Sequence, residues 1–419
     1  MRYIEEMENT VIFCCGKAVI VYEKGSDEAK ILTLPCSDNV PASEFKGVCI
    51  RLSDDKKYLA VACESKVVLI WSTDTWMLQH THNLVKRPMS IDITSDSAVL
   101  LVADKTGDVY HFPLRGNNSS EGNANSENGN NTETDIFREM KSEPQPLLGH
   151  LSMLLDLVVT KDKKYIITSD RDEKIRVSHY PNSYNIESFC LGHREFVTQV
   201  DLLPGKEPLL LSCSGDGTLM LWNYLTGHCL STVTTHEHAV SLLHHFEEYC
   251  HQRITDSEEA KRFLPEYPAV KNFSVCAAKD GCYHVAVVID RLPALFLYKI
   301  ENKKIIHTST TKMVMQPLVV MWLVTGELMV EQNSEDEPLA VFQLQQETMT
   351  AVPNHPIILF GRKYQMYFNE GKKELNIDIL YKQRYDNMAD YLKKKQERLE
   401  VEKAVEAGMS PPLKKGRWV

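Results

Sequence analysis

The chain has 419 residues, of which 43% are hydrophobic and 25% are charged, and its formal net charge is −10. This length can bury a large core, either as one repeat domain or as two or three ordinary domains. The acidic balance excludes a protein that coats nucleic acid over its whole surface, because phosphate contacts need clustered lysine and arginine. Any contact with nucleic acid is therefore expected to be local or shared with a partner.

The eleven cysteines show no disulfide or zinc pattern. No two are spaced as CxxC, and only Cys14 and Cys15 are adjacent. Reduced thiols are typical of an intracellular protein. The N-terminal sequence MRYIEEMENT lacks the apolar segment of a secretion signal, and no stretch approaches 18 apolar residues, so we expect no membrane contact.

Short apolar runs typical of β-strands recur along the chain. In chain order they are AVIVY (18–22), VLIW (68–71), DVYHF (108–112), KIRVS (174–178), TLMLW (218–222), ALFLY (294–298) and LAVFQ (339–343). With Val19, Val68, Val109, Ile175, Leu219, Leu295 and Leu339 as equivalent positions, the steps are 49, 41, 66, 44, 76 and 44 residues. A period of about 40 to 45 residues indicates a β-propeller, and the two long steps contain insertions.

Two of the units align closely. Gly149 and His150 align with Gly192 and His193, 43 residues further on, and Asp172 aligns with Asp216. The GH dipeptide and the spacing from Asp216 to Trp222 resemble the WD repeat, a family in which His, Ser or Thr, Asp and Trp form a hydrogen-bonded chain inside each blade. His193, Ser212, Asp216 and Trp222 fit all four positions, and His150, Thr168 and Asp172 fit three. The resemblance implies structural roles for these residues.

Seven units predict an all-β fold, a seven-bladed WD-repeat β-propeller over residues 11–382 followed by a C-terminal charged helix at 383–405. Residues 116–144 are rich in Asn, Ser, Gly and Glu and are expected to be a disordered insertion. A second extension, at about 236–268, is expected to be partly helical, and residues 406–419 to form a disordered basic tail. The strand that seals the ring is either missing or supplied by residues 355–381, HPIILFGRKYQMYFNEGKKELNIDILY.

No motif for enzymatic chemistry stands out. The Gly215 to Gly217 pair lies in a repeat turn, where a nucleotide site is not expected, and there is no P-loop or GxSxG. The stretch HEHAVSLLHH lacks the second histidine of HExxH, because Val240 stands there. Its histidines could ligate a metal in principle, but no cysteine or carboxylate set completes a shell. We expect no catalytic residue, no metal and no small-molecule substrate.

The stretch SDRDEKIRVS, residues 169–178, concentrates six charges in one turn and strand. Period-two alternation directs Ile175 and Val177 into the blade and Arg176 away from it. The preceding unit places Lys105 in the equivalent turn. A catalytic carboxylate site is disfavoured because the turn is convex and flanked by bases. A solvated charged turn and a docking surface for another molecule both remain open.

Several stretches resemble the family of WD-repeat, non-catalytic subunits of the tRNA guanine-N7 methyltransferase. They are VADKTGDVY, LGHLSMLLD, DRDEKIRVS, IESFCLGHREFV, LLLSCSGDGTL and, near the C-terminus, YDNMADYLKKKQERL. The resemblance implies a scaffold that binds the catalytic subunit and helps to place tRNA for methylation of guanosine 46. S-adenosylmethionine is then expected on the partner, with no cofactor on this chain.

The resemblance also implies site residues. It assigns partner docking to Arg171, Asp172, Glu173, Lys174 and Arg176, with Lys105 on the adjoining blade. Arg176 is the first choice for a salt bridge to a carboxylate of the enzyme, because guanidinium binds carboxylate bidentately. Glu173 would bind a basic residue of the same partner.

Four cations of the expected C-terminal helix lie within two turns. Lys393, Lys394, Lys395 and Arg398 are suited to phosphate contact, but a solvated helix with pairs such as Lys393 with Glu397 explains them equally well. The family likeness and the basic sequence PPLKKGR imply a nuclear location, with or without a cytoplasmic fraction. The alternative to the scaffold is a general WD-repeat adaptor, such as a substrate receptor of a ubiquitin ligase.

Overall fold

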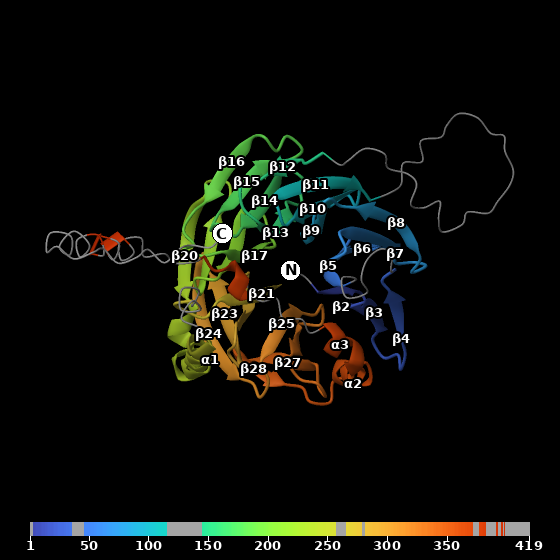
Figure 1. Cartoon of the computed structure of the whole chain (residues 1–419). Coiled ribbons are helices and arrows are strands. Elements are labelled where there is room, and N and C mark those ends of the chain that lie inside the picture. Colours follow the sequence, from blue (N-terminus) through green and yellow to red (C-terminus); the bar gives the residue numbers. More distant parts are fainter. Residues whose placement is uncertain are drawn as a thin grey trace, which may run out of the picture.

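Seven four-stranded antiparallel sheets stand around a common centre in the computed structural model (Figure 1). The structure describes residues 3–35, 46–114, 145–256, 265–278, 281–371, 377–382, 391–392, 395–396 and 398. This arrangement confirms the predicted seven-bladed propeller. All seven apolar runs chosen as equivalent lie in the third strand of their blades. The predicted insertion at 116–144 and the predicted tail at 406–419 lie outside the described residues.

Each blade is built from four consecutive strands. Blades 1 and 2 consist of β1 Ile4–Met7, β2 Thr10–Cys15, β3 Ala18–Glu23, β4 Ala29–Thr33, β5 Gly47–Leu52, β6 Tyr58–Cys63, β7 Val67–Ser72 and β8 Leu78–Asn83. Blades 3 and 4 consist of β9 Pro88–Ile93, β10 Val99–Asp104, β11 Asp108–Pro113, β12 Leu148–Gly149, β13 Leu154–Val159, β14 Tyr165–Asp170, β15 Ile175–His179 and β16 Ile186–Cys190. Blades 5 to 7 consist of β17 Val197–Leu202, β18 Leu209–Ser214, β19 Thr218–Asn223, β20 His228–Thr234, β21 Val270–Ala277, β22 Tyr283–Ile289, β23 Ala294–Glu301, β24 Lys304–Lys312, β25 Pro317–Trp322, β26 Glu327–Gln332, β27 Leu339–Gln345 and β28 Thr348–Ala351.

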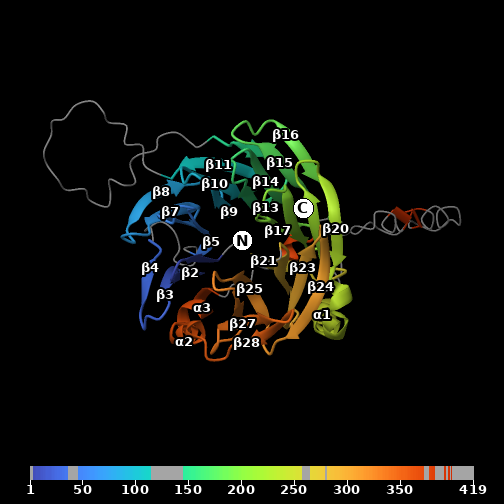
Figure 2. The same ribbon diagram turned by 180° about the vertical axis from the view of Figure 1, so that it is seen from behind.

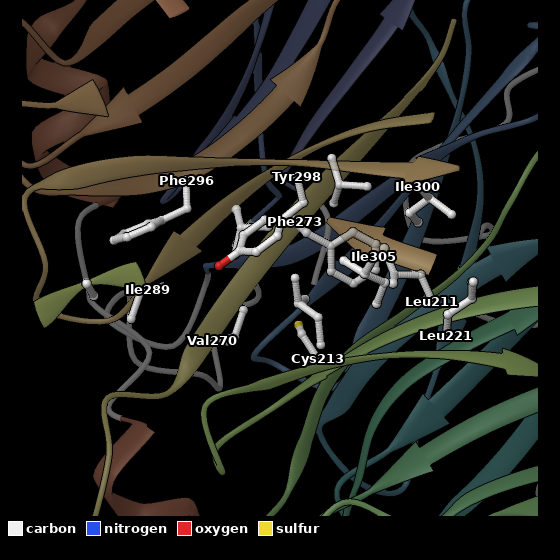
Figure 3. Close-up of a cluster of buried hydrophobic side chains, with 14 of the residues drawn as sticks. Leu211, Cys213, Leu221, Val270, Phe273, Ile289, Phe296, Tyr298, Ile300 and Ile305 are labelled. Atoms are coloured by element: carbon white, nitrogen blue, oxygen red, sulfur yellow. The ribbon is translucent and has the colours of Figure 1, made fainter. Parts of the chain in front are cut away.

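The middle strands are apolar on both faces because each sheet is covered by a neighbouring sheet on either side. All six residues of β18 are buried, whereas four of the five residues of the outer strand β16 are not. Figure 3 shows the core between blades 5 and 6, where Phe273, Phe296 and Tyr298 pack near Leu211 and Leu221. Such cores set the angle between neighbouring blades and so place their turns on a common face.

Two helices, and no exchanged strand, fill the junction of blades 7 and 1 in the described chain. Helices α2 Pro356–Lys363 and α3 Gln365–Gly371 lie between β27 and β2 (Figure 1). The ring of Phe360 stacks on Tyr22 at 4.1 Å and on Phe13 at 5.6 Å between centroids. Of the two alternatives for ring closure, a missing sealing strand agrees with the described chain, and supply of that strand by residues 355–381 does not. Pro356 opens a helix whose side chains Ile357, Ile358 and Phe360 are all buried.

The first blade also begins earlier than expected. Strand β1 starts at Ile4, ahead of the boundary predicted at residue 11. Only Ile4 of this strand is buried, and the two central glutamates interrupt the apolar pattern by which the other strands were found. Its carboxylates make specific contacts, because Glu6 Oε2 accepts a hydrogen bond from the amide of Val324 in blade 7 at 2.6 Å. This bond joins the two ends of the ring.

Polar side chains of the innermost strands connect successive blades. Arg51 Nε donates to Asp92 Oδ1 (2.6 Å), Asp92 Oδ2 accepts from Val159 N (2.8 Å), Asp156 Oδ2 accepts from Val200 N (3.1 Å), Gln199 Nε2 donates to Phe273 O (3.0 Å) and Asn272 Oδ1 accepts from Val320 N (3.2 Å). Each bond joins one blade to the next, from blade 2 to blade 7. The inner ring is therefore held by directional hydrogen bonds as well as by apolar packing.

The second extension lies outside blades 5 and 6 (Figure 2). It comprises the 3-10 helices η1 Thr235–His238 and η2 Val240–Leu242 and the helix α1 Leu243–Asp256. Leu242 and Phe246 bury themselves in the core between these blades. The short helix η4 Ile377–Leu380 follows α3, and residues 391, 392, 395, 396 and 398 are helical within the predicted range 383–405. No helix among the described residues is long and apolar enough to cross a membrane.

Candidate protein-docking site

Blade 5 contains a buried chain of hydrogen bonds through all four residues that fit the WD pattern. His193 Nδ1 lies 3.2 Å from Asp216 Oδ2, and its Nε2 lies 2.7 Å from Ser212 Oγ. Trp222 Nε1 donates to the same hydroxyl at 2.8 Å. The chain holds the loop before β17, the turn after β18 and strand β19 together. These groups are fully engaged inside the blade and present no chemistry to the surface.

Blade 4 departs from the expected pattern. His150 Nε2 lies 2.8 Å from Thr168 Oγ1, but its Nδ1 contacts Asp170 Oδ2 at 3.1 Å and not Asp172. Asp170 is the last residue of β14, where blade 5 has Ser214, so the carboxylate reaches the histidine from the strand and not from the turn. The structural role assigned to Asp172 is therefore wrong. Asp172 is about half exposed and lies in the turn.

The turn of blade 4 bears a backbone conformation that glycine adopts in the neighbouring blades. Glu173 has φ of 72°, against 76° for Gly217 in blade 5 and 107° for Gly107 in blade 3. A residue with a Cβ in this left-handed region costs about 1 kcal/mol or more relative to glycine. The tip of the blade 4 turn is thus locally strained, as is the corresponding turn of blade 2, where Lys66 has φ of 64°.

Arg176 is a brace inside the molecule. Its side chain is half-buried, and its nitrogens donate to Ser178 Oγ at 2.8 Å, Gly149 O at 2.9 Å and Ser183 O at 3.1 Å. Burial lowers the pKa of this guanidinium. The expectation that Arg176 points away from the blade and is free to bind a carboxylate bidentately does not match this geometry. Its contacts join β15 to the outer strand of blade 3.

Arg171 and Glu173 hold the segment that leaves the propeller. Arg171 Nε donates to Leu380 O at 2.9 Å, and its Nη2 donates to Tyr381 O at 3.3 Å. Lys382 Nζ lies 2.5 Å from Glu173 Oε1 and 3.6 Å from Asp172 Oδ1. Partial burial lowers the pKa of Lys382, but the hydrogen bond and charge of Glu173 raise it above its usual value. Lys174 is exposed and donates to Asp172 O at 3.2 Å.

A loop with an exposed leucine lies between the turns of blades 3 and 4. At Gly107, two residues after the exposed Lys105, a Cβ would meet the carbonyl oxygens of His150 and Ser152 at 2.5 and 2.7 Å. On the other side of the loop, Met153 O accepts from the amide of Arg171 at 2.9 Å. Leu151, between these contacts, is fully exposed. We call Lys105, Leu151, Asp172, Glu173 and Lys174 the docking face.

The tail cations divide between described and undescribed positions. Lys395 and Arg398 are helical and exposed, whereas Lys393 and Lys394 lie outside the described residues. The histidines of the second extension take part in ring contacts. His238 stacks on His307 at 4.2 Å, and His236 stacks on Tyr267 at 4.0 Å. Within the described part of the chain, no three His, Cys, Asp or Glu side chains are grouped so as to hold a metal.

Sequence reasoning missed the C-terminal residues that contact the turn of blade 4. Asp378 and Tyr381 were included only in the segment considered as a sealing strand, and Lys382 only in the predicted propeller range 11–382. Their signal is weak, because IDILYK is a short apolar run that fits no repeat unit. The unmatched apolar run directly before a charged tail could have indicated a segment that packs onto the propeller.

Comparisons with known proteins agree with this architecture. The family profile described as the tRNA methyltransferase TRM82 WD40 domain matches residues 37–138 and 126–353. The Danio rerio protein named tRNA (guanine-N(7)-)-methyltransferase non-catalytic subunit wdr4 is 31% identical, over 99% of this chain and 92% of its own. The Homo sapiens protein of the corresponding name is 29% identical over 92% and 83%.

Solved structures share the fold at low sequence identity. A chain from the crystal structure of the mitotic checkpoint complex aligns with a TM-score of 0.60 at 14% identity, covering 83% of this chain and 91% of its own. The WD40 repeats of RRP9 align with a TM-score of 0.55 at 13% identity, covering 78% and 84%. At such identities the likeness concerns the propeller alone.

Proposed function

This chain belongs to the family of the tRNA methyltransferase TRM82 WD40 domain, and from that membership we propose that it is the non-catalytic subunit of a tRNA guanine-N7 methyltransferase. The proposed role is that of a scaffold, which binds the catalytic subunit and supports the placement of tRNA for N7-methylguanosine formation at position 46. S-adenosylmethionine belongs, in this proposal, to the catalytic partner.

The docking face is the main structural observation that supports the proposed scaffold role. An exposed leucine surrounded by charges of both signs resembles the organisation of a protein interface, where an apolar anchor is ringed by polar groups that fix orientation. Glu173 holds its carboxylate at a backbone position where glycine would be less strained.

We propose two kinds of role for these residues: some contact the catalytic subunit directly, and others support the docking face from within the propeller. Asp172, Glu173, Lys174 and Lys105 supply charges that orient the catalytic subunit, and Leu151 supplies buried apolar area. Arg176 and Arg171 act behind this face. Arg176 braces β15 against blade 3, and Arg171 binds the carbonyl groups of the C-terminal segment.

Contact with tRNA is proposed for the tail. Lys395 and Arg398 are exposed on helical residues, and Lys393 and Lys394 complete a cluster of four cations in the sequence. Such a cluster gives modest, salt-dependent affinity for phosphate, which suits a subunit that shares RNA with its partner. A nuclear location is part of the same proposal, and rests on the family likeness and on the basic sequence PPLKKGR.

A matched pair of charge reversals tests the docking face. Glu173→Lys reverses a partly exposed carboxylate paired with Lys382, and Glu207→Lys reverses an exposed one paired with Lys303 at 3.0 Å. Glu207 lies between the first and second strands of blade 5, at the opposite end of the propeller from the second-to-third strand turns. We expect Glu173→Lys to weaken association with the catalytic subunit at least tenfold, and Glu207→Lys to leave it unchanged.

The assay is co-purification of the two subunits from one cell, followed by titration of the dissociation constant at physiological salt. Equal association for both variants would contradict docking at this face. The family match favours the scaffold over a general adaptor. The two also differ in cells, because tRNA from cells that lack a scaffold loses N7-methylguanosine, whereas loss of an adaptor leaves it in place.

A further inference from the structure

Residues 377–382, which follow the last blade, are bound to the same face of the propeller as the turn of blade 4. Ile377, Leu380 and Tyr381 are buried in a small core with Met89, Leu155, Phe196 and Ala269. These four partners come from or directly precede the inner strands of blades 3, 4, 5 and 6. Figure 1 shows η4 in red beside β21. Six residues at the end of the fold thus touch four successive blades.

Tyr381 is the main apolar anchor of the segment. It is buried, its ring meets Phe196 edge-on at 4.9 Å between centroids, and its hydroxyl donates to Gly215 O at 3.3 Å. Gly215 permits this packing, since a Cβ there would meet the Phe196 ring at 2.5 Å. Burial of this ring removes a large apolar area from water, so apolar packing holds the segment in addition to its ion pairs.

Polar contacts fasten both ends of the segment. At its start, Asp378 accepts two bonds from Arg291 Nη2 at 3.1 Å and one from the hydroxyl of Tyr249 in α1. The guanidinium of Arg291 also lies 3.6 Å above the Tyr249 ring. At its end, Arg171 binds the carbonyls of Leu380 and Tyr381, and Lys382 pairs with Glu173. The second extension thereby supports the segment from behind.

We propose that residues 377–382 form a clamp that fixes the start of the C-terminal tail beside the docking face, and that Asp378 and Tyr381 are positioning residues for tRNA binding by the assembled enzyme. The inference rests on the proposed function, because it takes the catalytic subunit as the occupant of the docking face and tRNA as the ligand of the tail. Neither residue contacts the RNA. They determine where the tail begins.

The physical reason is effective concentration. Lys382 is the last clamped residue, and Lys393 follows it by 11 positions. A short tether keeps the tail cations close to RNA that is already bound to the partner, so their binding becomes an intramolecular step. Releasing the clamp lengthens the tether and spreads the cations over a larger volume. Affinity for tRNA falls, although every cation is still present.

A linker insertion tests the clamp without altering any clamped residue. Inserting about 30 Gly and Ser residues directly after Lys382 adds a long flexible connection between the clamp and the tail cations and lowers their effective concentration several-fold. The assay is the dissociation constant of fluorescent tRNA with the purified heterodimer. The reference for complete loss of the tail contribution is a full-length chain with Lys393, Lys394, Lys395 and Arg398 replaced by Gln.

Release of the clamp by substitution gives a second measurement. The double variant Asp378→Ala with Tyr381→Ala should raise the rate of hydrogen exchange in residues 377–382. It should lower tRNA affinity toward the value of the four-glutamine tail variant, while association with the catalytic subunit stays the same. Tyr381→Phe is the matched control, because it keeps the buried ring and removes only the bond to Gly215 O. It should leave tRNA affinity within about twofold.

The outcomes separate the two proposals. The clamp proposal is overturned if the four-glutamine variant of the tail loses tRNA affinity but the linker insertion does not. That result leaves the scaffold function intact. If the four-glutamine variant of the tail loses no affinity, the clamp proposal is also overturned, because the tail cations then do not contribute to tRNA binding. Failure of the unmodified chain to associate with a catalytic subunit is a failure of the proposed function instead.

Discussion

Glu173 and Lys382 stand 209 positions apart in the sequence and form an ion pair with Oε1 and Nζ 2.5 Å apart. Glu173 belongs to the charged turn of blade 4, and Lys382 is the last described residue before position 391. The pair itself is exposed enough to contribute little stability. Its significance is spatial, because it brings the turn proposed to dock the catalytic subunit next to the origin of the tail proposed to bind tRNA.

Glu173→Gly separates folding from docking. The substitution removes the strain of a side chain at φ of 72° and loses one exposed ion pair. These effects are each about 1 kcal/mol and opposite in sign, so the free energy of unfolding should change by less than about 1 kcal/mol. Association with the catalytic subunit should nevertheless weaken about tenfold. Urea unfolding and a subunit titration measure the two quantities, and undiminished association would show that the carboxylate has no docking role.

Leu151→Ser tests the apolar anchor of the docking face. Leu151 is fully exposed in the free chain, so polar replacement should leave stability unchanged. If the catalytic subunit covers it, about 1.5 to 3 kcal/mol of apolar burial is lost, which weakens association roughly tenfold to a hundredfold. Val324→Ser, at a largely exposed position in the turn between β25 and β26, is the control and should have no effect. A dissociation constant unchanged by Leu151→Ser would remove this residue from the interface.

Arg176→Leu discriminates a brace from a direct partner contact. The variant loses the bonds to Ser178, Gly149 and Ser183 and leaves carbonyl groups without their donor. We expect the free chain to lose about 1 to 3 kcal/mol of stability, and the docking face to lose affinity as a consequence. Direct pairing with the enzyme, as the sequence suggested, would instead lower association while the unfolding of the free chain stayed the same.

The repeat pattern was sufficient to predict the ring, and insufficient to predict its closure. Third strands such as β19 are apolar runs because sheets cover both their faces. Strand β1 escaped notice because Glu5 and Glu6 are satisfied by contacts with Arg51, Lys24 and Val324, and the contact with Val324 is made only in the closed ring. For the same reason Arg176 was misjudged. Alternation gives the side of the strand on which a side chain lies. It does not show which carbonyl groups of other segments, here Gly149 O and Ser183 O, lie close enough to accept its hydrogen bonds.

The segment at 377–382 illustrates a second limit of sequence reasoning. Its contacts join Asp378 to Arg291 and Tyr381 to Gly215, residues separated by 87 and 166 positions. No local period or motif encodes such pairings, because they depend on how four blades converge on one face. The charges of the blade 4 turn drew attention to it in the sequence, whereas the segment that packs beside it in space did not.

Asp156→Ala tests the hydrogen bonds of the inner ring. The buried carboxylate accepts from Ser90 Oγ at 2.7 Å, from Leu157 N at 3.0 Å and from Val200 N of blade 5 at 3.1 Å. Removing it leaves buried donors without an acceptor and should cost about 3 kcal/mol of stability. Asp162→Ala, at a half-exposed turn carboxylate of the same blade, should cost less than about 1 kcal/mol. Similar losses for both variants would contradict a special role for the inner ring.

Asp216 should make stability depend on pH at the acid end. Burial raises the pKa of this carboxyl, but hydrogen bonds and charge from His193, with bonds from Thr218 and Arg194, outweigh it and lower the pKa from 3.8 to about 2. A carboxyl whose pKa is lower in the folded state stabilises the fold above its unfolded pKa, and this contribution is lost as the pH falls toward the folded value. The lowering is equivalent to about 2 kcal/mol. The free energy of unfolding of the wild type minus that of Asp216→Asn should therefore be constant above about pH 5 and shrink by about 1 kcal/mol at pH 3. Urea unfolding at pH 6 and pH 3 measures the change, and a difference that stays the same at both values would mean that Asp216 is not held in its charged form by the histidine.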